Sequence, residues 1–214
     1  MPKKETKFAY AVIYSSNGDF IIANKNNKAY YFTSRLLDPA KQDGWQVIPS
    51  GQLISLGGGM ACFPGGGMGS HAAEQAARME FLEETGVNLN GYPISAVASS
   101  GWTDGPYTYY GVYFRVAAAD LTGIFNQAIL SLNNSRWLAG VIQQQNSPIK
   151  LPTDVATEAN ANNMRPYAFD NELNNVEKWN CNNPDVINTI NGWTNQAQNW
   201  FINIFAQLRT LCQP

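Results

Sequence analysis

Three carboxylates are clustered in one short segment of the chain. Glu80, Glu83 and Glu84 are spaced so that a helix places all three on one side. Like charges at this spacing repel each other and weaken a helix by roughly a few tenths of a kcal/mol per pair. A cation removes that cost, and carboxylate oxygens are ligands that suit Mg²⁺ or Mn²⁺. Taken alone, such a cluster is more often a solvated acidic helix face, so its surroundings decide the interpretation.

A glycine-rich segment precedes this cluster. The triplet Gly65, Gly66 and Gly67 allows the backbone to approach a ligand closely, and the amides at the start of a following helix favour phosphate. Residues 72–85 are good helix formers, and Gly86 is typical of a helix C-terminus. The sequence therefore predicts a loop followed by a helix, a unit suited to metal and phosphate.

Residues 65–87 resemble the Nudix box, a motif written G-x5-E-x7-R-E-U-x-E-E-x-G-U, in which U is a bulky apolar residue. The positions that match are Gly65, Glu80, Phe81, Glu83, Glu84, Gly86 and Val87. Residues 8–23 are similar to the first strands of the family, and residues 170–179 to one of its late strands. The resemblance covers most of residues 8–117 and extends to 168–212, while the segment between them is unmatched.

Two positions depart from the motif. His71 replaces its first glutamate, and Met79 replaces its arginine, which in the family helps to orient the catalytic glutamates. Arg78 points about 100° away on the helix, so it is better placed for a pair with Glu74. His71 is also a candidate for a role near phosphate, but a role as helix N-cap, for which Ser70 is the other candidate, is the simpler expectation.

The resemblance implies a divalent-metal-dependent hydrolase that cleaves the pyrophosphate bond of a nucleoside diphosphate linked to another moiety. It assigns catalysis and metal ligation to Glu80, Glu83 and Glu84, with a backbone carbonyl of Gly65 or Gly66 completing the metal site. The cofactor would be Mg²⁺ or Mn²⁺, and the substrate an ADP-ribose-like compound or a nucleotide sugar. The two departures leave an alternative open, a Nudix-fold nucleotide-binding or regulatory protein with weak or no turnover.

Further candidate residues lie outside the glutamate cluster. They are Gly65, Gly66, Gly67, His71, Trp102, Tyr107, Asp154, Glu158 and Glu172. The glycines and the histidine would face the phosphates, and the two aromatic rings would stack on a nucleobase, although such rings are individually more often core. The three acids are candidates for one more carboxylate from a late loop, with Glu158 and Asp154 ranked ahead of Glu172.

These residues need a scaffold, and the pattern along the chain predicts one. Strands are expected at residues 8–14, 20–23, 93–98, 107–117 and 173–179. Residues 101–106 read as a loop, residues 118–168 as a mostly helical insertion with a loop at 153–166, and residues 184–212 as one long helix. We therefore expect a single α/β (α+β) domain over residues 1–214, a Nudix-like α/β/α sandwich with a curved mixed sheet. The insertion would lie over the site or build a homodimer contact.

The composition excludes several classes of protein and of binding partner. Charged residues make up 14% of the 214 residues and the net charge is −2, which does not suit binding to nucleic acid through bulk electrostatics. A hydrophobic content of 44% argues against disorder, and no apolar run approaches the roughly 20 residues of a membrane span. The three cysteines lack metal-binding spacing and no targeting segment is visible, so we expect reduced thiols in a cytoplasmic protein.

Overall fold

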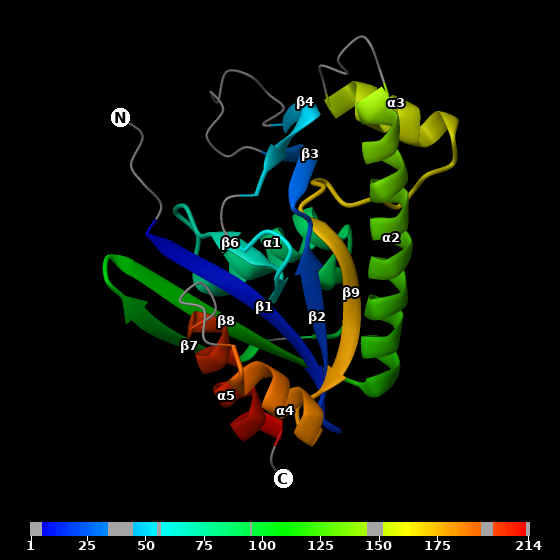
Figure 1. Ribbon diagram of the computed structural model, residues 1–214. Helices are drawn as coiled ribbons and strands as arrows, with labels where there is room; N and C mark the ends of the chain where they lie inside the picture. Colours follow the sequence, from blue (N-terminus) through cyan, green and yellow to red (C-terminus); the bar gives the residue numbers. More distant parts are fainter. Residues whose placement is uncertain are drawn as a thin grey trace.

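A mixed β-sheet organises the chain. The structure, a computed structural model, describes residues 6–33, 45–54, 57–94, 96–144, 152–193 and 199–212. The main sheet consists of β1 (Lys7–Ser15), β2 (Asp19–Lys25), β5 (Ala61–Cys62), β6 (Gly65–Gly67), β7 (Ala96–Asp104), β8 (Tyr107–Val116) and β9 (Leu173–Asn180). Its order is β5-β2-β1-β8-β7, with β6 on β1 and β9 on β2. Only the β1–β8 pairing is parallel among these described strands (Figure 1).

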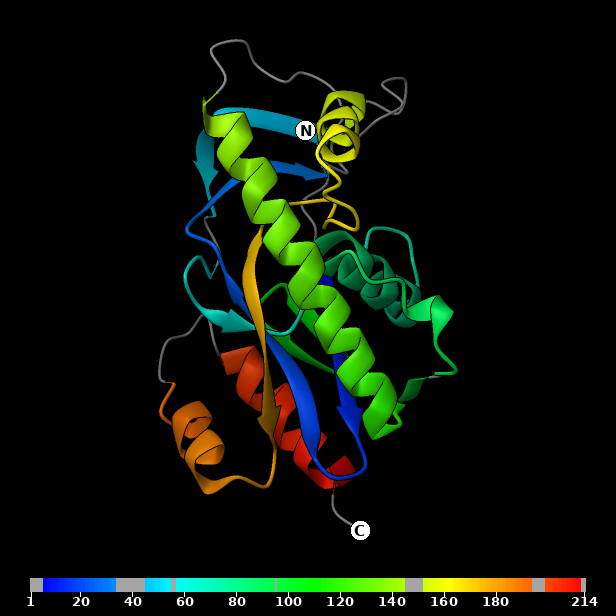
Figure 2. The same ribbon diagram turned by 90° about the vertical axis from the view of Figure 1, so that its right-hand side faces the viewer.

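Helices cover both faces of this sheet. Side chains alternate along β1, so Ala9 and Ile13 point to one face and Tyr10 and Val12 to the other. The first face packs on α1 (Ala73–Thr85) and α2 (Ala118–Gln144), and the second on α4 (Pro184–Asn191) and α5 (Asn199–Cys212) (Figures 1 and 2). The predicted α/β/α sandwich with a mixed sheet is therefore confirmed.

A smaller core extends the molecule at one end. The hairpin of β3 (Lys28–Thr33) and β4 (Trp45–Leu53) forms a separate two-stranded sheet. It packs on the last turns of α2 and on α3 (Pro152–Ala161) through Tyr31, Leu138 and Val155. This core fixes the position of the hairpin relative to the main sheet. A short 3₁₀ helix, η1 (Leu89–Gly91), follows α1.

The segment 118–168 is more regular than the sequence suggests. One continuous helix of 27 residues, α2, runs along the sheet next to β9 (Figure 2), and its buried face belongs to the main core. The loop predicted at 153–166 is wrong for its first part, where α3 lies. Val155 and Ala159, one helical turn apart, are both buried in the smaller core, so tertiary burial outweighs the loop-like Asn-rich composition.

Two other boundaries also differ from expectation. Gly101–Asp104, predicted as loop, belong to β7 because they pair with β8 up to Asp104 opposite Tyr107. The single long helix predicted over residues 184–212 is wrong, because α4 ends at Asn191, where the Gly192 amide donates back to the helix, and α5 begins at Asn199. Residues 194–198 lie outside the described residues. Both helices still bury apolar side chains against the same face of the sheet.

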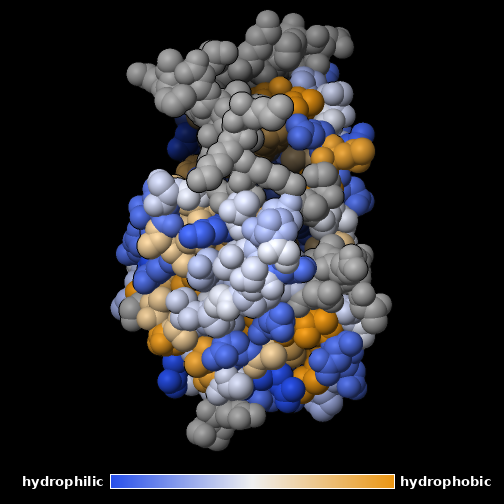
Figure 3. Space-filling view, turned by 90° about the vertical axis from the view of Figure 1, so that its left-hand side faces the viewer, coloured by the Kyte–Doolittle hydropathy of each residue, from blue (hydrophilic) through white to orange (hydrophobic). Residues whose placement is uncertain are grey.

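Figure 3 shows one side of the molecule, on which apolar residues are interspersed with polar ones. None of the helices in the described ranges combines the length and the apolar character that crossing a membrane requires.

Candidate functional site

The glycine triplet forms a short strand rather than a loop. In β6, Gly65, Gly66 and Gly67 pair antiparallel with β1. A Cβ on Gly65 would lie 2.3 Å from the carbonyl oxygen of Ala9, and one on Gly66 would lie 2.6 Å from Oε2 of Glu80. The position of Gly65 therefore requires glycine, because β6 lies tightly against the backbone of β1, whereas at Gly66 the closest contacts are with the movable end of the Glu80 side chain.

The helix α1 carries the three glutamates. Its buried face, with Ala76, Ala77 and Phe81, packs on the sheet, and Gly86 closes the helix in a left-handed conformation with its amide bonded to Leu82. The predicted N-cap is wrong: Ala72 caps the helix and provides no side-chain hydrogen bond.

Five carboxylates line one cavity of about 190 Å³ at the joint between α1 and β6. They are Glu80, Glu83, Glu84, Asp170 and Glu172, and Gly65, Gly66, Gly67 and Lys25 complete the described wall. The structure thus brings together all three box glutamates and the glycine triplet, as the sequence predicts. It adds Lys25 and Asp170, which sequence reasoning missed. Two features of the sequence could have indicated them. Lys25 ends an apolar strand, and Asp170 and Glu172 stand together just before a late strand.

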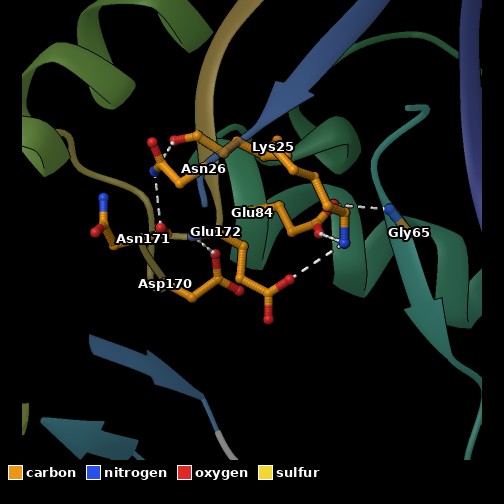
Figure 4. Close-up of polar contacts among 8 residues, drawn as sticks. Lys25, Asn26, Gly65, Glu84, Asp170, Asn171 and Glu172 are labelled. Atoms are coloured by element: carbon orange, nitrogen blue, oxygen red, sulfur yellow. Dashed lines mark hydrogen bonds and ion pairs between the residues drawn. The ribbon is translucent and has the colours of Figure 1, made fainter. Parts of the chain in front are cut away.

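Backbone contacts hold the segment before β9 against α1. The amides of Phe169 and Asp170 both donate to the Glu83 carbonyl, at 2.8 and 3.2 Å. Asp170 in turn accepts from the Glu172 amide at 3.2 Å. On the other side, the backbone amide of Asn26 donates to the backbone carbonyl of Glu172 at 2.7 Å (Figure 4). These bonds fix the two late acids relative to the helix.

Lys25 lies between two of the carboxylates. Its Nζ is 3.2 Å from Oε2 of Glu172 and 3.7 Å from Oε1 of Glu84 (Figure 4). The other oxygen of Glu84 accepts the Gly65 amide at 2.7 Å. The register of β2 with β9 pairs Lys25 with Leu173, next to Glu172, after an irregularity between Asn24 and Lys25. Pairing at the end of two strands therefore delivers the ammonium group to the acidic helix.

Burial and mutual repulsion shift the pKa values of the acids in this cavity. Burial raises the pKa of Glu84 to about 8; Lys25 lowers it, while Glu172 and Glu80 raise it further. Burial, together with Glu172 and Glu84, raises the pKa of Asp170 well above its ordinary value. Burial alone would lower the pKa of Lys25, but Glu84 and Glu172 outweigh it and hold that pKa well above its usual range. Protons on Glu84 and Asp170 therefore offset part of the negative charge that the single ammonium of Lys25 does not balance.

The donor chemistry fits a hard divalent cation. Every candidate ligand is a carboxylate or carbonyl oxygen, the set that Mg²⁺ and Mn²⁺ prefer. Within the described ranges, however, no three acidic, cysteine or histidine side chains converge closely enough to form a ready metal-binding group. Lys25 instead holds Glu84 and Glu172 in an ion-paired arrangement.

The remaining predicted residues do not line this cavity. His71 lies half-buried in the turn before α1, where its amide donates to the Met68 carbonyl. Trp102 and Tyr107, on β7 and β8, join Tyr109 in an aromatic group. Trp102 and Tyr109 pack on the core that α5 covers, whereas α1 lies on the opposite face of the sheet. Their predicted contact with the nucleobase is therefore not supported by their position.

Of the three candidate acids for a late carboxylate, the structure places one at the cavity. Glu172 reaches the cavity, although the sequence ranked it last. Glu158 lies on α3, where it accepts from the Asn162 side chain at 3.0 Å. Asp154 belongs to α3 too, but its side chain lies outside the described residues. A carboxylate next to a strand end reaches the site because that strand pairs with β2.

Arg78 behaves as predicted. It pairs with Glu74 at 2.9 Å on the exposed side of α1, and it stacks over the Phe114 ring with its guanidinium carbon 4.7 Å from the ring centre. It therefore does not replace the arginine that Met79 removes from the box.

Comparisons with known proteins give structural similarities only. No family model and no curated protein matches the sequence. One similar structure is the MutT protein from Methanosarcina mazei Go1, with 15% identity, 54% of this chain and 64% of that chain covered, and a TM-score of 0.30. An Ap4A hydrolase from C. elegans is 10% identical in sequence. The match covers 96% of this chain and 98% of that chain, with a TM-score of 0.39. The NUDIX domain of Shewanella oneidensis NrtR, complexed with ADP ribose, is 11% identical in sequence. The match covers 96% of this chain and 88% of that domain, with a TM-score of 0.39. The fold assigned here rests on the sheet and helices of this chain.

Proposed function

We propose that this chain is a Nudix-type hydrolase that uses a divalent metal to cleave the pyrophosphate bond of a nucleoside diphosphate linked to another moiety. The observation that carries the proposal is the cavity in which Glu80, Glu83 and Glu84 face a glycine strand, with Asp170 and Glu172 added from the segment before β9. Such a concentration of buried and half-buried carboxylates is costly unless bound protons or a cation offset the charge, and a divalent metal would do so most fully.

The residues have distinct roles in this proposal. Glu80, Glu84 and Glu172, with the Gly65 carbonyl, would hold Mg²⁺ or Mn²⁺, which neutralises the diphosphate and makes a bound water more acidic. The lack of a side chain at Gly66 lets the Glu80 carboxylate lie directly against the β6 backbone, where it would meet the metal-bound diphosphate. Glu83 orients the attacking water and receives its proton. The water oxygen bonds to one phosphorus while the bridging P–O bond breaks, so that two phosphate monoesters leave.

Lys25 would position two of these carboxylates and bind the substrate. Its ammonium lies at the wall of the cavity and fixes Glu84 and Glu172 before any ligand binds. It therefore reduces the repulsion between the two carboxylates and offers positive charge to the diphosphate. ADP-ribose-like compounds and nucleotide sugars are the first substrates to test.

One observation favours a second candidate function, a nucleotide-binding protein without turnover. The ammonium of Lys25 lies between Glu84 and Glu172, and no three-ligand metal group is formed among the residues that the structure describes. If this ion pair persists with nucleotide bound, Lys25 neutralises the acids and no metal enters.

Hydrolysis assays separate the two functions. ADP-ribose and a panel of nucleotide sugars are incubated with the protein in Mg²⁺, in Mn²⁺ and in EDTA, and released monophosphate is measured. We expect metal-dependent release, and a loss of at least about 100-fold in Glu83→Gln. Glu74→Gln is the matched control, because Glu74 lies on the same helix but pairs with Arg78 outside the cavity.

The outcomes are distinct. Release that persists in EDTA, or that is equal in Glu83→Gln and Glu74→Gln, contradicts the catalytic assignment. Nucleotide binding by calorimetry with no release in any metal favours the second function.

A further inference from the structure

A second cavity adjoins the acidic one. Its volume is about 240 Å³, and it shares Lys25 and Glu172 with the acidic cavity. Its other walls come from the small β3–β4 hairpin and the residue that follows it, with Phe32, Leu53 and Ile54 among them. The two cavities therefore meet at the ion pair between Lys25 and Glu172.

The chemistry of the second cavity differs from that of the first. Apolar surface from Phe32, Leu53 and Ile54 lies beside the amide of Gln52. Its charged residues, Lys25 and Glu172, are the two shared with the acidic cavity. Leu53 is 69% exposed, the largest value among the exposed large hydrophobic residues that the structure describes. Because Leu53 shares the wall of this cavity with Phe32 and Ile54, the three side chains together give the cavity an apolar side next to the polar site.

Hydrogen bonds hold the two cavities in a fixed relation. The backbone amide of Asn171 donates to the backbone carbonyl of Tyr31 at 2.8 Å. This bond ties β3 to the segment that carries Asp170 and Glu172. Tyr31 itself is fully buried, and its hydroxyl contacts the carbonyls of Ser135 and Ala168 at 3.4 Å. The hairpin is thus anchored on α2, and its cavity is a preformed neighbour of the acidic site rather than a detached groove.

The sizes fit a divided ligand. Neither cavity alone reaches the roughly 300 Å³ at the lower end of small-molecule sites, but the two together do. The acidic cavity suits a metal-bound diphosphate. The second suits an uncharged, planar group with ring nitrogens, since it offers an aromatic face, aliphatic walls and one amide.

We propose that the second cavity binds the nucleobase of the ligand whose diphosphate occupies the acidic cavity, with Phe32 as the stacking surface and Gln52 as the hydrogen-bonding partner. The inference rests on the proposed function, because it takes the acidic cavity as the diphosphate site. It moves the base-recognition role to the β3–β4 hairpin from Trp102, which lies on the face covered by α5, and from Tyr107, which lines neither cavity.

Calorimetry with two non-cleavable probes tests the proposal in Mg²⁺. One probe is α,β-methylene-ADP, and the other is methylenediphosphonate, which lacks the nucleoside. We expect the wild-type protein to bind the first probe more tightly. In Phe32→Ala the affinity for α,β-methylene-ADP falls by at least about fivefold, the lower limit for losing one base–aromatic stack. The affinity for methylenediphosphonate stays unchanged.

Two further variants secure the result. Leu53→Ser alters the same wall at an exposed position, so it tests the cavity without disturbing a core. Tyr107→Ala is the control, since it removes a half-buried ring outside both cavities. We expect Leu53→Ser to weaken binding of the nucleoside probe alone and Tyr107→Ala to leave both affinities intact.

The failures are distinguishable. Wild-type protein that binds neither probe and cleaves no diphosphate overturns the proposed function together with this inference. Wild-type protein that cleaves ADP-ribose, while Phe32→Ala and Leu53→Ser keep the wild-type preference for the nucleoside probe, overturns the inference alone.

Discussion

The Nζ atom of Lys25 lies 3.7 Å from Oε1 of Glu84, and both side chains are largely buried, with 14% and 3% of their surfaces exposed. The carboxylate comes from α1 and the ammonium from the end of β2, so this pair joins the helix to the sheet. Removing one partner of a buried ion pair leaves the other without compensation, which costs more than losing an exposed pair.

Replacing Lys25 should therefore destabilise the protein. In Lys25→Met we expect the free energy of unfolding at neutral pH to fall by up to about 3 kcal/mol, the low end for a broken buried pair because Glu84 can take up a proton. Urea unfolding measures the change. Lys28→Met, at an exposed position on β3, is the control. Equal midpoints for the two variants would show that the pair contributes nothing.

The raised pKa of Glu84 should make stability depend on pH. Its folded pKa of about 8 exceeds the ordinary value of 4.5, so the folded state binds the proton more tightly than the unfolded state. That contribution is complete below about pH 4.5 and is lost as pH rises to about 8. Metal-free protein should lose stability over this range. Glu84→Gln should reduce the slope, with Asp170 supplying the remainder; an unchanged slope argues against this titration.

Divalent metal should reverse that trend. Mg²⁺ competes with the proton for the carboxylates, so we expect it to raise Tm more at about pH 8 than at about pH 6. The measurement compares Tm in Mg²⁺ and in EDTA across this range. Glu74→Gln should keep the metal effect, whereas Glu84→Gln should lose most of it. A Tm that is the same in Mg²⁺ and EDTA at every pH would count against a metal site.

The two glycines of β6 should respond differently to alanine. Gly65→Ala places a Cβ 2.3 Å from a backbone oxygen of β1, so we expect a loss of stability of about 1–3 kcal/mol. Gly66→Ala meets only the end of the Glu80 side chain, at 2.6 Å, which can move aside. It should keep nearly wild-type stability but lose hydrolysis. Urea midpoints and rates measured together test this; the opposite assignment of the two effects would contradict the geometry.

Two thiols far apart in the sequence are neighbours in the fold. Cys181, directly after β9, and Cys212, at the end of α5, form a hydrogen bond that lowers the pKa of Cys181 and raises that of Cys212. We expect mild oxidation to join them in an intramolecular disulfide, detected by mass spectrometry after digestion. Cys62→Ser should still form it, and Cys212→Ser should not. The three cysteines are free in the structure, and a cytoplasmic location stays a prediction.

Local patterns in the sequence were sufficient for the elements of the site. The spacing of Glu80, Glu83 and Glu84 depends only on helical geometry, and Gly86 ends α1 because it tolerates a left-handed conformation. The alternation in β1 likewise follows from the period of a strand. Such features are set by neighbours along the chain, so they could be read without knowing the fold.

Only the tertiary structure decided what surrounds the glutamates. Lys25 and Glu172 meet because β2 pairs with β9, and Asp170 joins them because its amide bonds to α1. Trp102 was assigned to a base-binding loop, but β7 carries it to the face under α5. Strand pairing and choice of sheet face are long-range interactions between segments whose sequences do not specify each other. The sequence by itself therefore determined where the carboxylates stand on their helix, and the fold decided that Lys25, Asp170 and Glu172 lie beside them.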